Sequence, residues 1–114
     1  MTDRSLSVVQ GTLDFLVLKT LQAAGEQHGF GILDFIRRAT DEALVVEEGA
    51  LYPALHRMER RGWLEGEWGV SEKGRRAKYY GLTSAGEEVL AREQARWSAY
   101  VDAVARIVPE AAGG

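Results

Sequence analysis

Residues 47–64 read EEGALYPALHRMERRGWL and carry the clearest signal of the fold. The apolar residues Leu51, Leu55 and Met58 of this stretch recur at helical spacing, and Ala54 lies between them. This periodicity predicts a short amphipathic helix that buries one apolar stripe, because residues three and four apart lie on the same face of a helix.

Both ends of this helix are marked in the sequence. We expect Gly49 to permit the turn into it and Pro53 to lie near its first turn, where a missing N–H costs no hydrogen bond. Gly62 should end the helix in the left-handed conformation that glycine adopts without steric penalty.

The face opposite the stripe is polar and rich in hydrogen-bond donors. It carries Tyr52, His56, Arg57, Arg60 and Arg61. Such side chains suit phosphates and base edges, so these residues are candidates for contacts with DNA. A solvated basic face on an ordinary helix is the alternative, and only the segments that follow distinguish the two interpretations.

Length and composition exclude several classes of protein. A chain of 114 residues forms one domain. Without cysteine and with only two histidines, a metal site, a cofactor or thiol chemistry is not expected. No convincing set of nucleophile, base and orienting group can be assembled, so we expect no enzyme activity. No apolar run reaches the length of a membrane span, and a cytoplasmic protein is predicted.

Charge is distributed unevenly along the chain. The net charge is −3, but residues 56–78 contain seven Lys or Arg against four Glu. That segment therefore carries +3 and the remainder −6. Positive potential concentrated in one region would orient a polyanion such as DNA toward it.

The N-terminal part predicts two helices. The first helix is expected over residues 7–24 and should end at Gly25. Its apolar residues occupy more than one face, which predicts a second packing partner such as another subunit. HGFGI at 28–32 predicts a tight turn, and the second helix follows with Ile32, Phe35, Ile36 and Ala39 on one side. Residues 44–46 form a short β-branched run typical of an edge strand.

A β-hairpin with a basic tip is predicted next. Residues 63–70 alternate, with Leu64, Trp68 and Val70 on one side, and residues 77–82 form the second strand. The polar turn at 71–76 and the start of the second strand contribute four cations within six residues, namely Lys73, Arg75, Arg76 and Lys78. An exposed hairpin tip of this kind can reach a phosphate row or a narrow groove, so the four are further DNA-binding candidates.

The C-terminal segment predicts one long helix that begins at the N-cap Thr83 and runs to Val108. A dimerisation seam is predicted at Leu90, Trp97, Val101, Val104 and Val108. Gln94 and Tyr100 lie one turn from Trp97, and the three could hold a small ligand between subunits. Residues 109–114 are expected to form a disordered tail.

Together these elements predict a mainly α fold with a small β-hairpin: a winged helix-turn-helix DNA-binding domain over 1–83 and a C-terminal dimerisation helix over 84–108.

The chain also resembles PadR-like transcriptional regulators in three blocks: HGFGI at 28–32, GALYPALHRMERRGWL at 49–64 and KYYGLTSAG at 78–86. The resemblance implies a homodimeric winged-helix repressor in its short form, with a single C-terminal helix. Ser84 stands where the family often has Pro, and Ala50 where it commonly has Ser or Thr, so a hydroxyl contact at the start of the central helix is absent.

We therefore expect a sequence-specific regulator that binds double-stranded DNA as a homodimer on a pseudo-palindromic operator. A small-molecule effector could release it from DNA. The alternative is a winged-helix protein-interaction module that does not bind DNA, and the basic hairpin tip favours DNA.

Overall fold

The computed structural model describes residues 6–9 and 11–109. Its elements, in chain order, are β1 (Leu6–Ser7), α1 (Leu13–Ala24), β2 (Gln27–His28), α2 (Gly29–Ala39), β3 (Leu44–Val45), α3 (Glu48–Arg60), β4 (Leu64–Val70), β5 (Arg76–Leu82) and α4 (Ser84–Ala105). The predicted fold class is confirmed, because helices dominate and a β-hairpin lies between α3 and α4. Residues 110–114 of the predicted tail lie outside the described residues.

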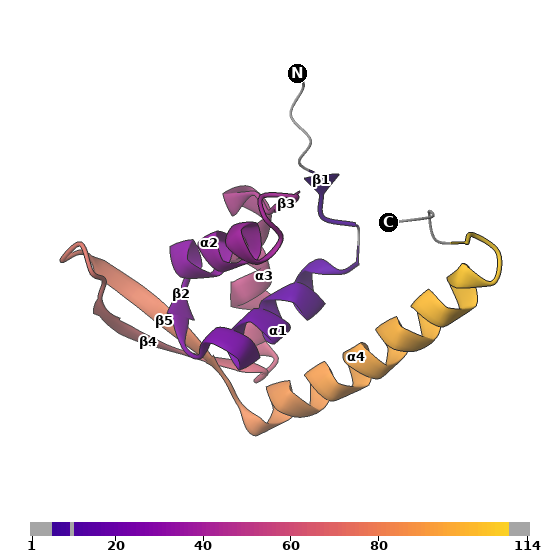
Figure 1. The fold of residues 1–114 in the computed structure, drawn as a ribbon. Coiled ribbons are helices and arrows are strands. Elements are labelled where there is room, and N and C mark those ends of the chain that lie inside the picture. Colours follow the sequence, from indigo (N-terminus) through magenta and orange to yellow (C-terminus); the bar gives the residue numbers. More distant parts are fainter. Residues whose placement is uncertain (1–5, 10, 110–114) are drawn as a thin grey trace, which may run out of the picture.

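Helices α1, α2 and α3 pack together into a compact body (Figure 1). The hairpin β4–β5, which we call the wing, projects from one side of this body, and α4 runs away from it on another (Figure 1). In the antiparallel sheet β5 lies between β2 and β4, whereas β1 and β3 form a separate parallel pair. The wing is thus attached to the body through β2.

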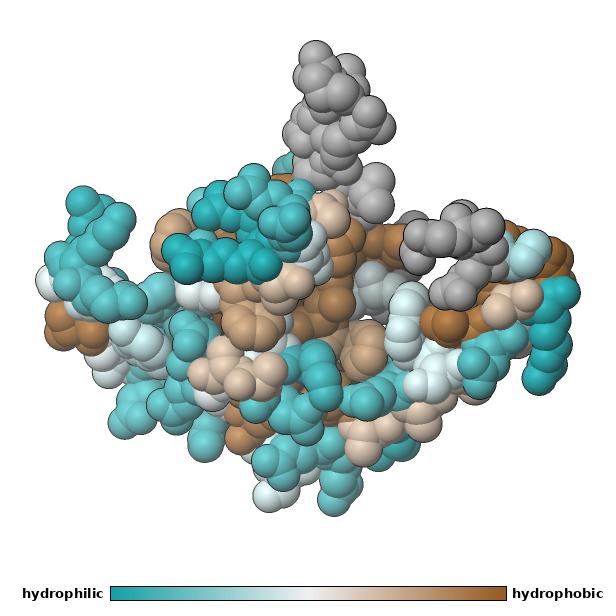
Figure 2. Space-filling model, viewed as in Figure 1, coloured by the Kyte–Doolittle hydropathy of each residue, from teal (hydrophilic) through white to brown (hydrophobic). Residues whose placement is uncertain are grey.

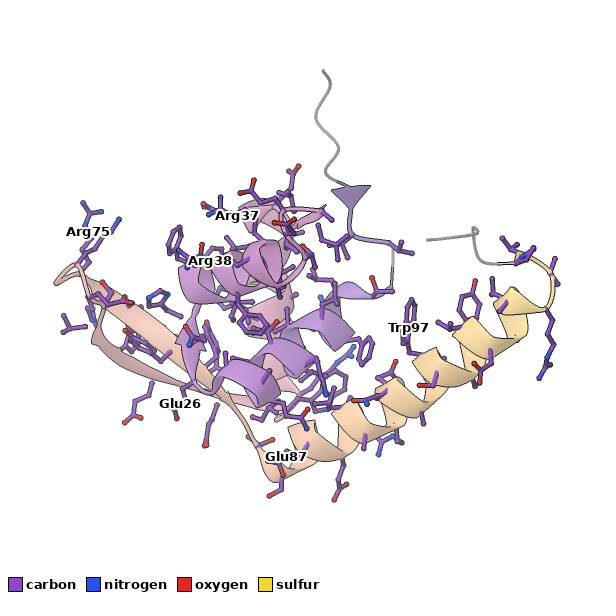
Figure 3. The ribbon with its side chains drawn as sticks, in the orientation of Figure 1. Glu26, Arg37, Arg38, Arg75, Glu87 and Trp97 are labelled. Atoms are coloured by element: carbon purple, nitrogen blue, oxygen red, sulfur yellow. The ribbon has the colours of Figure 1, made fainter. Side chains whose placement is uncertain are left out.

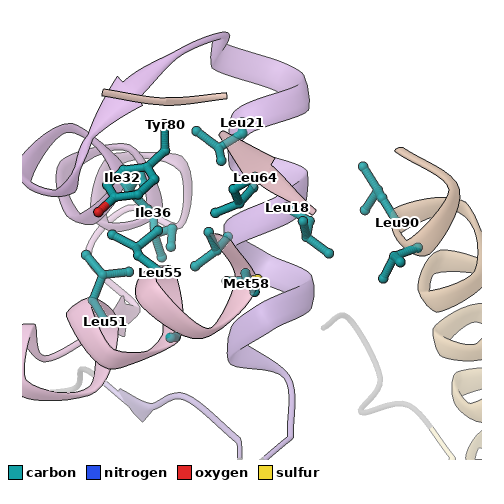
Figure 4. Close-up of a cluster of buried hydrophobic side chains, with 13 residues drawn as sticks. Leu18, Leu21, Ile32, Ile36, Leu51, Leu55, Met58, Leu64, Tyr80 and Leu90 are labelled. Carbon is teal, nitrogen blue, oxygen red and sulfur yellow. The ribbon is translucent and has the colours of Figure 1, made fainter. Parts of the chain in front are cut away.

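The core lies where α1, α2, α3 and the base of the wing meet (Figure 4). The predicted stripe of α3 is fully buried: Leu51, Leu55 and Met58 are each 0% exposed. Their partners come from α1, α2, both wing strands and the start of α4, and include Leu18, Leu21, Ile32, Ile36, Leu64, Tyr80 and Leu90. Since burial of each such side chain is worth about 1.5–3 kcal/mol, this stripe fixes the rotation of α3 in the body.

The first helix is shorter than predicted. It begins at Leu13 rather than near residue 7, because Gly11 adopts a positive φ of 89° that a helix cannot contain. Thr12 occupies the N-cap position but its side chain caps no helix N–H, because its hydroxyl donates to the Val9 carbonyl at 2.6 Å. Residues 6–7 instead form β1, paired with β3, so the predicted edge strand exists and has a partner that periodicity did not reveal.

HGFGI does not form a turn between helices, which corrects the prediction. His28 ends β2 and caps α2, where its Nδ1 accepts a hydrogen bond from the Gly31 N–H at 2.9 Å. Both glycines therefore belong to the first turn of α2. Strand β2 escaped sequence analysis because two residues cannot show a period, and only pairing with Tyr79 and Tyr80 defines it.

The ends of α3 differ partly from expectation. Glu47 is the N-cap, so Gly49 lies within the first turn rather than before it, and Pro53 is the sixth residue of the helix. The missing Pro53 N–H leaves the Gly49 carbonyl without its usual partner, which an exposed face tolerates. Gly62 ends the helix as predicted, with a φ of 80°.

The predicted cap of α4 is confirmed. The Thr83 hydroxyl accepts a hydrogen bond from the Gly86 N–H at 3.0 Å. The helix ends at Ala105, three residues earlier than predicted. Among the described residues, no helix is both long and apolar enough to cross a membrane.

Two helical glycines allow a matched test of this packing. A Cβ at Gly86 would lie 2.1 Å from the Trp63 carbonyl oxygen, whereas a Cβ at Gly49 meets nothing within 4 Å. We expect Gly86→Ala to lower the free energy of unfolding by about 1–3 kcal/mol through overpacking. Gly49→Ala should raise it by up to about 1 kcal/mol through helix propensity. Urea unfolding of both variants measures this, and equal effects would contradict the close contact.

Candidate nucleic-acid interface

One row of side chains on α3 faces solvent. It is spaced every fourth residue and contains Glu48, Tyr52, His56 and Arg60, all exposed. Burial of the stripe turns this row outward, because residues four apart share one face of a helix. Three of the five residues predicted on the polar face therefore stand together.

The other two predicted helix residues have partners within the protomer. The Arg57 guanidinium forms an ion pair with the Asp14 carboxylate of α1. Arg61 follows the helix, and its guanidinium carbon lies 5.2 Å from the centroid of the Trp63 ring. Sequence spacing placed all five on one face, but the structure separates Arg57 and Arg61 from the exposed row.

Tyr52 is held against the N-terminus of α2. A Cβ at Gly29 would lie 2.4 Å from the Tyr52 hydroxyl, so the absence of a side chain at Gly29 makes room for this ring. Burial raises the pKa of Tyr52, and the negative charge of Glu48 adds to the shift. The phenol, neutral at physiological pH like any tyrosine, can donate a hydrogen bond.

The tip of the wing carries exposed cations. The Ser71 N–H donates to the Arg75 carbonyl at 2.8 Å and closes the turn, in which Gly74 takes a φ of 76°. Lys73, Arg75 and Arg76 are exposed around this turn, as predicted from the sequence. Figure 3 shows Arg75 extending from the tip into solvent.

Lys78, the fourth predicted wing cation, lies below the tip. Its ammonium donates to the Glu59 carboxylate of α3 at 2.9 Å, and this hydrogen bond raises the pKa of Lys78. The pKa of the neighbouring Tyr80 is also raised, in this case by burial of its ring. Lys78 therefore joins the wing to α3 and is less accessible to a phosphate than the tip residues.

A cleft of about 1170 Å³ separates the wing from α2 and α3. We call it the wing cleft. Tyr52 and His56 line one wall, and Arg76 lines the other. Phe30 and Arg38 of α2 also line it. Neither residue was predicted from the sequence to belong to a site, although two consecutive arginines, Arg37 and Arg38 (Figure 3), lie at the end of the predicted second helix.

Arg37 and Arg38 share one carboxylate. Their side chains contact the two oxygens of Asp34 at 3.1 and 3.0 Å, on the same helix. One negative charge faces two positive ones, so the end of α2 retains a net positive charge beside the wing cleft. The excess of arginine at the exposed end of α2 is the sequence signal that could have identified this positive surface.

The predicted dimerisation seam divides into two parts. Leu90 is 1% exposed and packs in the protomer's own core, so it offers no surface to a second chain, contrary to our expectation. Trp97 and Val101 are each 43% exposed, Val104 is half-buried, and Val108 is exposed just beyond the helix. Figure 2 shows hydrophobic surface along this distal part of α4.

The three ligand candidates lie on this same part of α4. Trp97 points toward α1 (Figure 3), and its ring centroid lies 6.2 Å from that of Phe15 and 6.4 Å from that of Tyr100. The Gln94 side-chain oxygen accepts a hydrogen bond from Lys19 at 3.3 Å. An aromatic group and a polar group thus stand within two turns of one another.

Comparisons with known proteins point to one family. Residues 17–92 match the transcriptional regulator PadR-like family. A transcriptional regulator from Clostridium thermocellum is 29% identical, with a TM-score of 0.78 over 88% of this chain and 96% of that one. A PadR-like transcription factor from Bacteroides fragilis is 32% identical, with a TM-score of 0.69 over 85% and 90%.

A PadR-like transcriptional regulator from Bacillus cereus is 25% identical, with a TM-score of 0.74 over 90% of this chain and 97% of that one. An uncharacterized protein from Lysinibacillus sphaericus is 26% identical over 91 residues, which is 80% of this chain and 83% of that protein. The family match covers most of α1, all of α2, α3 and the wing, and the start of α4.

Proposed function

This chain belongs to the PadR-like family of transcriptional regulators and is a DNA-binding regulator, and from that premise we propose that it is a homodimeric repressor of a pseudo-palindromic operator. The observation that carries the proposal is the wing cleft. Its α3 wall presents Tyr52 and His56, and its opposite wall presents Arg76 of the cationic tip. Donors and cations facing one space suit a DNA duplex.

Each wall has a distinct role in this proposal. The exposed row of α3 enters the major groove, where Tyr52, His56 and Arg60 reach base edges, because a helix fits that groove and each base pair shows a distinct pattern there. The wing follows the sugar–phosphate backbone toward the adjacent minor groove. Its cations supply affinity, and α3 supplies specificity.

The distal face of α4 supports the homodimer. Trp97, Val101 and Val108 leave apolar area exposed on one chain, and a second copy of the same helix would cover it. A two-fold dimer presents two α3 helices, so the half-sites should lie about 10–10.5 base pairs apart, or a multiple of that. Occupying such an operator would repress transcription, and we propose that the protein does so in the cytoplasm.

Removing two wing cations tests DNA binding. We expect Arg75→Ala combined with Arg76→Ala to weaken binding to every sequence, because phosphate contacts carry no base information. The slope of log K against log salt should flatten by up to roughly two units, at about 0.9 per phosphate contact. Fluorescence anisotropy with promoter DNA from the protein's own locus, over a series of salt concentrations, measures it.

A matched control removes the same charge elsewhere. Arg92 and Arg96 are exposed on α4, away from the wing cleft, and their double alanine variant should keep the wild-type slope. An unchanged slope in the wing variant would show that the tip does not touch phosphate. No DNA binding by the wild type would favour the protein-interaction module instead.

A charge on the distal face of α4 tests the dimer. Val101 is exposed in the single chain, so Val101→Asp should leave the protomer folded. In a dimer it would bury a carboxylate without a partner, which costs several kcal/mol, so the variant should be monomeric and lose tight operator binding. Sedimentation velocity measures this, with Ala99→Asp on the opposite side of α4 as the control. A wild-type monomer at micromolar concentration would refute the proposal.

We also propose that a small planar or apolar effector binds beside Trp97 and releases the DNA. Release requires that the effector favour a dimer whose two α3 helices are wrongly spaced. Trp97→Phe should remove effector-dependent fluorescence quenching, while the fluorescence of Trp63 and Trp68 should remain. If no compound in a panel of planar cations and aromatic acids both quenches Trp97 and weakens DNA binding, this part of the proposal fails.

A further inference from the structure

An arginine and a tryptophan are stacked on the wing. The guanidinium carbon of Arg76 lies 4.3 Å from the centroid of the Trp68 ring, a distance at which a cation is attracted to the face of an indole. Trp68 is nevertheless 56% exposed, so it fills no place in the core. An exposed tryptophan that contributes little to folding calls for another explanation.

Strand register puts the two side chains on one face of the wing. Trp68 lies directly opposite Lys78, and Arg76 opposite Val70, so Arg76 is the diagonal neighbour of Trp68. Diagonal neighbours on an antiparallel sheet lie within reach of long and aromatic side chains. Leu64 and Tyr80, on this same face, are buried against the body, whereas Trp68 and Arg76 line the wing cleft.

The two cations on this face are held in different ways. Lys78 is paired with the Glu59 carboxylate at 2.9 Å, which neutralises its charge. Arg76 contacts no carboxylate within ion-pair distance in the part of the chain that the structure describes. Stacking on an aromatic ring restricts a long side chain yet leaves its charge uncompensated, and the N–H donors at the guanidinium edge remain free.

We propose that Trp68 is a positioning residue for DNA binding: its ring holds the Arg76 guanidinium in the wing cleft, ready to donate to a backbone phosphate. The inference rests on the proposed function and assigns a role to a residue outside the exposed row and the basic tip. Because a guanidinium fixed before binding loses less rotamer entropy on contact, removing the ring weakens binding without removing a charge.

Double-mutant cycles separate this role from others. The probe is a short random-sequence duplex, since phosphate contacts are independent of sequence. Trp68→Leu should weaken binding about two- to fivefold, the equivalent of an exposed cation–π contact, and should lower the salt slope by up to about 0.9. In the Arg76→Ala background it should have no further effect, whereas in the Arg75→Ala background the same loss should persist.

Conservative variants and a fold control complete the design. Trp68→Phe should retain part of the affinity because a phenyl ring still accepts a cation. Arg76→Lys keeps the charge and should lose about as much as Trp68→Leu, since an ammonium lacks the planar stack. Circular dichroism melts should show the same midpoint for Trp68→Leu as for the wild type.

The possible outcomes are distinct. Wild-type protein that does not bind the duplex sinks the proposed function itself. Wild-type binding with an equal loss for Trp68→Leu in the Arg76→Ala background overturns the positioning role and makes Trp68 a direct contact. If Trp68→Leu lowers the melting midpoint and its loss of affinity disappears at lower temperature, the positioning role is overturned in favour of a role in folding.

Discussion

Burial of one side of α3 sets the orientation of this helix in the body and, with it, the positions of its neighbours. Leu51, Leu55 and Met58 are removed from water against α1, α2 and the wing base, and a rotation of α3 by one residue, about 100°, would expose them. The same burial turns the row containing Tyr52, His56 and Arg60 outward. Stability and the choice of binding face therefore follow from one periodicity.

A second constraint fixes the wing relative to α3. The chain leaves α3 through two hydrogen bonds that close its last turn: the Gly62 N–H donates to the Glu59 carbonyl and the Trp63 N–H to the Met58 carbonyl, each at 3.0 Å. After the wing it returns to this point, where the Thr83 hydroxyl donates to the Gly62 carbonyl at 2.6 Å. Wing, α3 and α4 thus meet at one turn, and the Lys78–Glu59 pair adds a cross-link above it. The proposed base-reading role of α3 and phosphate-binding role of the wing would need a fixed spacing between the two, and these bonds provide one.

Exposed apolar side chains occur in two places that differ in their surroundings. On distal α4, Trp97 and Val101 lie among other apolar residues, a setting typical of an interface with another chain. On the wing, Trp68 lies among cations and beside a cleft. A tryptophan ring with an arginine stacked on it contributes electrostatic attraction as well as buried area, because its face stabilises a cation without neutralising it.

The sequence was enough to predict the stripe and the Gly62 end of α3, the Thr83 cap and the order of helices and hairpin, because these depend on residues within a few positions of one another. It did not reveal β2, which exists only through pairing with β5, nor that Leu90 packs in the protomer's own core. It also could not separate Arg57, Lys78 and Arg76, which look alike in a list of cations. Their difference arises from contacts between distant segments of the chain: Asp14 and Glu59 neutralise the first two, whereas stacking on Trp68 leaves the third charged.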